Sequence, residues 1–180
     1  MRELSLNMMD IVQNSITANA TLVNIQELHD VVNNTLLLSV SDNGFGMTAE
    51  QVSNVQSPFY TTRTTRKVGL GIPLFKMACE MTGGNLTLES ERGVGTKITA
   101  EFITGHIDMT PVGDMAETLV LLIAGNPHMD FVYEKRVCDK EYILDTRELR
   151  VVLGDDISLS DHDVIVWIRE YLAEKELEII

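Results

Sequence analysis

Two polar side chains near the start of the sequence have the spacing of a possible metal site. Asp10 and Asn14 stand four residues apart in a stretch, residues 3–18, whose apolar residues recur at helical spacing. Residues four apart lie on one face of a helix, so this pair presents a carboxylate and an amide one turn apart. Oxygen ligands of this kind suit Mg²⁺, which keeps several of its waters. The pair is a candidate magnesium site, and a solvated helix face is the alternative.

A second acid, Asp42, follows an apolar stretch and precedes the glycine pair Gly44 and Gly46. Glycine allows the backbone to approach a flat ligand closely, and a carboxylate accepts hydrogen bonds from an exocyclic amine such as that of adenine. An Asn-Gly pair can also mark a simple hairpin turn. A helix over residues 48–55 is expected next, rather than a returning strand, so the pattern favours a turn that binds a base.

A cationic segment lies between Glu50 and Glu80, where the sequence contains no acidic residue. Its cations are Arg63, Arg66, Lys67 and Lys76. The chain as a whole has a net charge of −13, and a second glycine pair, Gly69 and Gly71, opens a helix expected over residues 70–82. Backbone amides at such a helix start form an anion site, so the segment is a candidate polyphosphate-binding loop. A mobile surface loop is the alternative.

The elements that must position these residues alternate between helices and strand pairs. Strands are expected over residues 21–28, 35–41, 85–91 and 96–103, because apolar residues alternate or run together there between turn residues. Four strands with helices on one face form a two-layer α/β sandwich, which is an α+β fold. His29 lies in the turn after the first strand, where we expect it to be solvated.

Residues 104–180 differ in charge from the part before them. Their net charge is −10, against −3 for residues 1–103, so we expect a domain boundary near residue 104. The later part is predicted to be a small α+β extension, with helices over residues 114–124 and 161–177. Strands are expected over residues 131–137 and 141–145. The extension shows no catalytic pattern, and its role is left open.

The composition argues against several classes of protein. A net charge of −13 opposes non-specific nucleic-acid binding, which requires clustered Lys and Arg. The longest apolar run covers residues 119–124, far below the roughly 20 residues that cross a bilayer. Cys79 and Cys138 alone fit neither a disulfide framework nor a zinc site. We therefore expect a cytoplasmic protein with no nucleic-acid or membrane partner.

Five short motifs now occur in an order that resembles the GHKL superfamily, which includes histidine kinases, type II topoisomerases, heat-shock chaperones and mismatch-repair ATPases. The segment DIVQNSITANA resembles the N box, DNGFGM the G1 box, SPFYTTR the F box, VGLGIPL the G2 box and GVGT the G3 motif. The resemblance covers residues 1–103 and implies the Bergerat ATP-binding fold. The sequence is most similar to stand-alone histidine-kinase-type ATP-binding proteins of anaerobic bacteria.

The resemblance implies ATP and Mg²⁺ as ligands and gives roles to individual residues. Asn14 would ligate Mg²⁺, and Asp42 would contact adenine. The implied nucleotide-binding residues are Asn14, Asp42, Gly44, Gly46, Met47, Phe59, Arg63, Arg66, Lys67, Gly69, Leu70, Gly71 and Thr96. Asp10 stands where ATP-hydrolysing relatives carry a Glu as general base, and it is the candidate catalytic residue although its side chain is one methylene shorter.

The implied function is phosphotransfer from Mg-ATP to a partner protein in trans, within a two-component or similar signalling system. An ATP/ADP-gated regulatory module with little or no turnover, similar to the anti-sigma-factor kinases, is the main alternative. It is favoured by Asp10 in place of Glu and by the acidic extension, which could dock a basic partner. A structural domain with a vestigial pocket is the third hypothesis, because a fold does not fix a function.

Overall fold

The computed structural model of the chain describes residues 3–55, 70–154 and 156–179. Its helices are α1 (Leu4–Thr17), α2 (Ala49–Val55), α3 (Gly71–Glu80), α4 (Met115–Gly125), α5 (Thr146–Leu153) and α6 (His162–Ile179). Its strands are β1 (Leu22–Asp30), β2 (Thr35–Asp42), β3 (Asn85–Glu91), β4 (Gly95–Ile103), β5 (Asp130–Val137) and β6 (Lys140–Asp145). The described elements follow the order that the apolar patterns predict.

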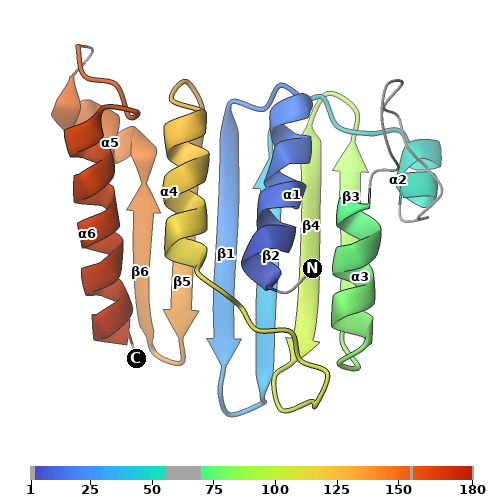
Figure 1. The fold of residues 1–180 in the computed structure, drawn as a ribbon. Coiled ribbons are helices and arrows are strands. Elements are labelled where there is room, and N and C mark those ends of the chain that lie inside the picture. The colour runs from blue at the N-terminus through green and yellow to red at the C-terminus, as the bar shows by residue number, and fades with distance from the viewer. Residues whose placement is uncertain (1–2, 56–69, 155, 180) are drawn as a thin grey trace.

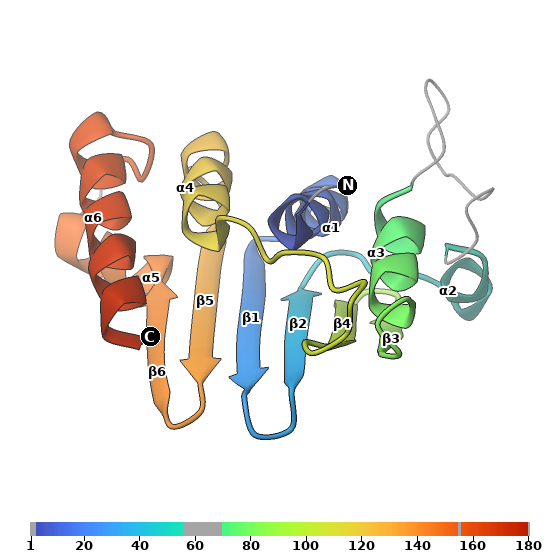
Figure 2. The same ribbon diagram turned by 60° about the horizontal axis from the view of Figure 1, so that its bottom comes forward.

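The strands form one six-stranded sheet in the order β3-β4-β2-β1-β5-β6. All neighbouring strands are antiparallel except β1 and β5, which are parallel. Helices α1, α3, α4 and α6 lie over one face of the sheet (Figures 1 and 2). The expected two-layer α+β sandwich is confirmed, and the sheet is wider than the four strands of residues 1–103.

The hydrophobic core lies between this helical layer and the sheet. On α1 the apolar stripe Leu4, Met8, Ile11 and Val12 is fully buried, because these residues recur every three or four positions. On α3, the ring of Phe75 packs against Phe102 of β4 with 5.7 Å between ring centroids. Helices α1 and α3 are therefore fixed side by side over the central strands.

The opposite face of the sheet carries polar side chains. The hydroxyl of Thr99 donates to the hydroxyl of Ser39 across β4 and β2 at 3.3 Å. The amide of Gln26 donates to the carboxylate of Glu134 across β1 and β5 at 2.8 Å. A sheet with one face in the core and one face in solvent needs such alternation of apolar and polar residues.

The C-terminal strands extend the same sheet. Strand β5 lies beside β1, with Ile25 opposite Tyr133. The connection from β4 returns past the start of α1, where the Leu4 and Ser5 amides donate to the Pro111 and Val112 carbonyls at 2.9 and 2.8 Å. Residues 104–180 are thus packed on the first part, and the domain boundary near residue 104 stays a prediction. No helix among the described residues has the length and apolar character needed to cross a bilayer.

Candidate nucleotide-binding site

The carboxylate of Asp42 joins helix α1 to the glycine turn. Asp42 is the last residue of β2, and its Oδ2 accepts a hydrogen bond from the hydroxyl of Ser15 at 2.6 Å. Its Oδ1 accepts from the backbone amide of Gly44 at 2.9 Å. Ser15 is 2% exposed, whereas Asp42 is half-buried. Each carboxylate oxygen keeps acceptor capacity for a further donor, so this group is held in place yet chemically available.

The two glycines of this turn are required by the neighbouring backbone. A Cβ on Gly44 would lie 2.7 Å from the carbonyl oxygen of Ala18. Gly46 has φ +63°, and a Cβ there would lie 2.0 Å from the carbonyl oxygen of Glu91. The Phe45 amide donates to the Ala18 carbonyl at 3.0 Å. The turn is therefore pressed between the end of α1 and the β3–β4 hairpin, and its contact with a ligand stays a prediction.

Asn43, between Asp42 and Gly44, anchors the turn to the start of β1. Its Oδ1 accepts from the backbone amides of Thr21 and Leu22 at 2.9 and 3.0 Å. Its Nδ2 donates to the hydroxyl of Thr21 at 2.9 Å. In the sequence, Asn43 is distinguished only as part of an Asn-Gly turn signal. The side chain of Asn43 thus satisfies the backbone amides of both Thr21 and Leu22. These hydrogen bonds fix the direction in which the chain leaves β2.

Met47 and Thr96 are joined through hydrogen bonds by Ser90, which is not among the predicted site residues. The hydroxyl of Ser90 accepts from the Met47 amide at 2.8 Å and lies 2.8 Å from the hydroxyl of Thr96. Thr96 stands opposite Asp42 in the β2–β4 pairing. The turn, the end of β2 and the start of β4 therefore form one hydrogen-bonded unit. Alternation along β3 could have identified Ser90 as a polar residue on the helix-facing side.

Helices α1 and α3 bring the other predicted residues to this end of the sheet. Asp10 and Asn14 are both exposed, one turn apart on α1. Helix α3 begins at Gly71, and a Cβ at Gly71 would lie 3.3 Å from the Cβ of Asp10. Leu70 precedes α3 and provides no side-chain cap, and the first turn of α3 holds no acidic residue. The positive end of the α3 dipole therefore lies near the polar face of α1.

Comparison with known families agrees with this arrangement. Residues 1–105 match the family of histidine kinase-, DNA gyrase B-, and HSP90-like ATPases. The chain belongs to this family. This match confirms the resemblance drawn from the motifs.

The chain spans only a small part of the length of the curated relatives that it matches. It is 39% identical over 61 residues to sporulation kinase E of Bacillus subtilis, which covers 34% of the chain and 8% of that protein. It is 37% identical over 62 residues to sensor histidine kinase ZraS of Klebsiella oxytoca, which covers 34% of the chain and 13% of that protein. The matched segment is thus about a tenth of each of these relatives.

A solved structure shares the fold at low sequence identity. The crystal structure of the N-terminal domain of a DNA repair protein matches with a TM-score of 0.56 and 17% identity. The match covers 81% of the chain and 53% of that structure, so it includes part of the C-terminal strands or helices as well. At this identity the match shows the fold of the chain alone.

Not every predicted site residue lies in the part of the chain that the structure describes. Phe59, Arg63, Arg66, Lys67 and Gly69 lie outside the described residues. The remaining predicted residues lie on α1, on the turn after β2, at the start of α3 and on β4. Their contact with a nucleotide stays a prediction.

A separate charged cluster connects β1, β5, β6 and α6. Glu27 of β1 is 1% exposed, and its Oε2 accepts from the hydroxyl of Tyr133 at 2.6 Å. The ammonium of Lys135 lies 3.2 Å from Glu27 Oε1 and 2.7 Å from Glu176 Oε2. The hydroxyl of Tyr142 donates to Glu176 at 2.7 Å. The alternating pattern of β1 predicted an apolar inner face and therefore missed this cluster.

His29 belongs to the same cluster, so its expected place in a solvated turn is wrong. It lies within β1, with its Nε2 2.7 Å from Glu27 Oε1. Burial alone would raise the pKa of Glu27, but the hydrogen bond with His29, the charge of Lys135 and the hydrogen bond from Tyr133 outweigh it. The pKa of Glu27 lies below its ordinary value, so this buried carboxylate is ionised and satisfied.

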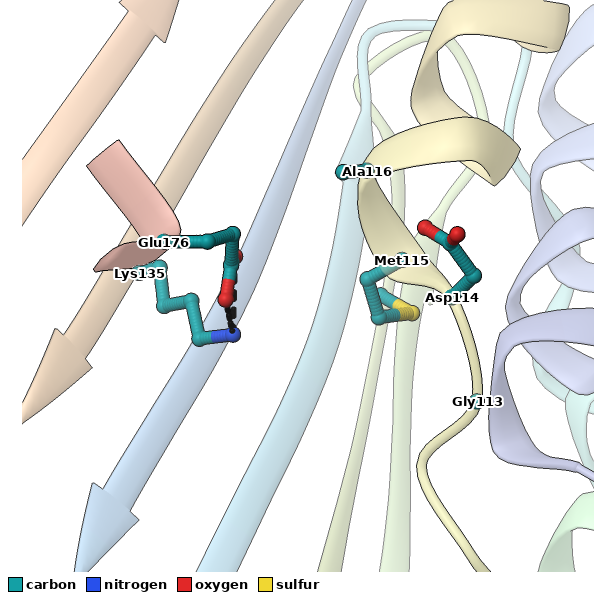
Figure 3. A pocket seen from close by; sticks show the side chains of 6 residues that line it. All are labelled: Gly113, Asp114, Met115, Ala116, Lys135 and Glu176. Carbon is teal, nitrogen blue, oxygen red and sulfur yellow. Dashed lines mark hydrogen bonds and ion pairs between the residues drawn. The ribbon is translucent and has the colours of Figure 1, made fainter. Parts of the chain in front are cut away.

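A hollow of about 300 Å³ lies beside this cluster. Figure 3 shows it between the start of α4 and the ion pair of Lys135 with Glu176. Its lining residues are Gly113, Asp114, Met115, Ala116, Lys135 and Glu176. Its lining comes from the start of α4, from β5 and from α6, which are not the elements that carry Asp42 and the glycine turn. Lys135 and Glu176 are paired with each other, and the Asp114 carboxylate accepts from the Glu117 amide as the cap of α4, so we do not assign the nucleotide to this hollow.

Proposed function

We propose that this protein binds Mg-ATP between α1, the glycine turn and the start of α3, and transfers a phosphoryl group to a partner protein in trans. The observation that supports this most is the Asp42 carboxylate, which is held by Ser15 and Gly44 at 2.6 and 2.9 Å. A fixed acceptor beside a glycine turn is what a base-binding pocket requires, since an adenine amine donates and a carboxylate only accepts.

The residues present fit a nucleotide chemically. Asp42 would accept from the exocyclic amine of adenine, and Met47 would provide apolar contact with the ring. The backbone amides at the start of α3 would face the phosphates, because no acidic side chain occupies that first turn. Thr96 would support the Asp42 side of the pocket through Ser90, whose hydroxyl lies 2.8 Å from that of Thr96.

A magnesium ion would be held by Asn14 together with the phosphates. Among the described residues, no group of three or more His, Cys, Asp or Glu side chains has the arrangement of a metal site. Mg²⁺ in nucleotide sites uses one or two protein oxygens and takes its other ligands from phosphates and water, so a single amide suffices. The ion would neutralise the charge that develops during phosphoryl transfer.

Asp10 would act on the attacking group. It is exposed and lies one turn before Asn14 on α1. It also lies beside the start of α3, because a Cβ added at Gly71 would be 3.3 Å from the Asp10 Cβ. A carboxylate there can accept a proton from, or orient, a water or a hydroxyl that approaches the terminal phosphate. The cations Arg63, Arg66 and Lys67 remain predicted phosphate contacts.

Transfer to a partner is proposed because of the relatives' names. Sporulation kinase E and sensor histidine kinase ZraS are kinases by those names, and each matches 34% of this chain. A signalling or regulatory role follows by analogy, and the phosphoacceptor is a separate protein in this proposal. The partner is expected to be a protein and not a nucleic acid, because the net charge of −13 opposes phosphate backbones.

A regulator gated by ATP and ADP, with little turnover, is the second candidate. It is favoured by Asp10, whose side chain is one methylene shorter than the Glu of ATP-hydrolysing relatives and reaches less far from α1. The two candidates share the same pocket and differ in whether the terminal phosphate leaves.

Calorimetric titration with ATP, ADP and GTP, with and without Mg²⁺, tests the shared pocket. We expect ATP binding that depends on Mg²⁺ and is stronger than GTP binding, because guanine carries a carbonyl where adenine carries the amine. Incubation with γ-labelled ATP then separates the candidates: hydrolysis or protein labelling that is lost in Asp10→Ala supports the kinase. ATP binding without hydrolysis or labelling supports the regulator, and no binding of any nucleotide contradicts both.

A further inference from the structure

The outer face of α6 combines exposed apolar side chains with carboxylates. We give the name acidic face to the residues Asp163, Trp167, Glu170, Glu174, Leu177 and Glu178, all of which are exposed. Their spacing of three or four residues places them on one side of the helix. The buried residues Val164, Ile168, Leu172 and Ile179 lie on the opposite side, against the sheet. The acidic face therefore points away from the core, at the edge of the molecule (Figure 1).

The carboxylates of this face are largely unneutralised. Among the described residues, Asp163, Glu170 and Glu174 form no ion pair. Of the two cations of α6, Arg169 pairs with Glu117 of α4 at 2.9 Å, and Lys175 pairs with Glu178 of the acidic face at 2.6 Å. Residues 104–180 together carry a net charge of −10. The resulting field attracts a cationic surface over a distance of about a Debye length, about 8 Å at physiological salt.

The apolar side chains of the acidic face are exposed, and the Trp167 ring is fixed in position by its neighbours. Trp167 is 47% exposed, and its ring stacks on that of Tyr171 with 5.3 Å between centroids and 14° between planes. The hydroxyl of Tyr171 donates to the carbonyl of Ile143 in β6 at 3.2 Å, which fixes the pair to the sheet. Leu177 is 80% exposed. A fixed, exposed aromatic ring loses little conformational entropy when a partner covers it, and Trp is enriched among residues that dominate binding.

The order of these side chains along α6 defines what would fit. Leu177 follows Trp167 by ten positions, which is about 15 Å along a helix, and Glu170 and Glu174 lie between them. We propose that the acidic face docks a basic amphipathic helix of a partner protein. Such a helix would place Lys or Arg opposite Glu170 and Glu174, and apolar side chains against Trp167 and Leu177. This site does not depend on the proposed nucleotide pocket, which lies toward the other edge of the sheet.

Trp167 is the single tryptophan of the chain and reports directly on this surface. The full chain is titrated with a synthetic peptide of Lys, Leu and Ala that forms a basic amphipathic helix of about 18 residues, five turns, and with the same peptide in which Glu replaces Lys. We expect only the basic peptide to shift Trp167 emission to the blue and to protect it from acrylamide. Binding should weaken steeply between about 50 mM and about 500 mM salt.

Two paired variants test where the peptide binds. The double change Glu170→Gln and Glu174→Gln should weaken binding about tenfold, since two charge pairs are lost. The matched control Glu89→Gln and Glu101→Gln removes two exposed carboxylates from the sheet and should leave binding unchanged. Equal weakening by both pairs, or no response of Trp167 to the basic peptide, overturns the proposal.

Other occupants of the face give different results. A concentration-dependent dimer of the chain alone, lost in Leu177→Ala, would assign the face to a second copy and overturn the proposal. A blue shift of Trp167 with phosphatidylglycerol vesicles or duplex DNA would overturn it as well. Each readout is independent of ATP binding, so failure here is distinguishable from failure of the proposed function.

Discussion

Replacement of Asp42 by Asn tests the nucleotide assignment with a minimal change of shape. The substitution keeps the size of the side chain but removes its charge and turns one acceptor into a donor. The adenine amine would then meet a neutral acceptor or a second amine. We expect the affinity for ATP to fall by about 2 kcal/mol or more, which is about thirtyfold in Kd.

The same substitution also weakens the fold, and this effect follows from the geometry. Ser15 and Gly44 donate to the two carboxylate oxygens at 2.6 and 2.9 Å. Hydrogen bonds to charged groups contribute more than neutral ones, so the free energy of unfolding should fall by about 1–2 kcal/mol. Urea unfolding at constant m-value measures this loss and shows the range in which the variant stays folded.

The two effects are separated by a second variant. Ser15→Ala removes one hydrogen bond to Asp42 and leaves the carboxylate in place, so it should lower stability by about 1 kcal/mol with a much smaller change in ATP affinity. Calorimetric titration of wild type, Asp42→Asn and Ser15→Ala is the assay. An unchanged Kd for ATP in folded Asp42→Asn would refute the reasoning, because it would remove Asp42 from the binding site.

Three further substitutions, one of them with a matched control, have defined outcomes. Gly95→Ala should lower the free energy of unfolding by about 2–3 kcal/mol in urea melts, because its Cβ would lie 1.9 Å from the Asp42 carbonyl oxygen at φ +141°. Gly93→Ala, with φ +85° and no atom within 4 Å, should cost only about 1 kcal/mol, and equal losses would contradict the clash. Glu27→Gln should lower stability by about 2–4 kcal/mol at neutral pH, since it removes a buried charge partner. Because folding lowers the pKa of Glu27 below 4.5, the wild-type advantage should be complete above pH 4.5 and vanish as pH falls through the lowered pKa; a loss that persists in acid would contradict this. Asn14→Ala should reduce the ratio of ATP affinities measured with Mg²⁺ and with chelator, and an unchanged ratio would remove Asn14 from the metal site.

The sequence determined the local elements and the predicted site because both depend on short-range patterns. The stripe of Leu4, Met8 and Ile11 fixes which side of α1 is buried, and this also fixes that Asp10 and Asn14 face outward. The glycines of the turn after β2 mark positions where a side chain cannot be accommodated. Order and spacing of the motifs then identified the family without any knowledge of long-range contacts.

The tertiary structure decided which strands become neighbours and what lies between them. Strand β5 pairs in parallel with β1, about a hundred residues earlier in the chain. The local sequence pattern of β5 does not predict this pairing, because backbone hydrogen bonding is the same for any partner strand. That pairing brings Lys135 to Glu27 and allows a charged residue to occupy the inner face of a strand. In the same way Ser90 and Asn43 gain their roles only from the strands and turns beside them. Sequence periodicity fixes which face of an element is inward, whereas the partner across that face is set by the packing of the whole chain.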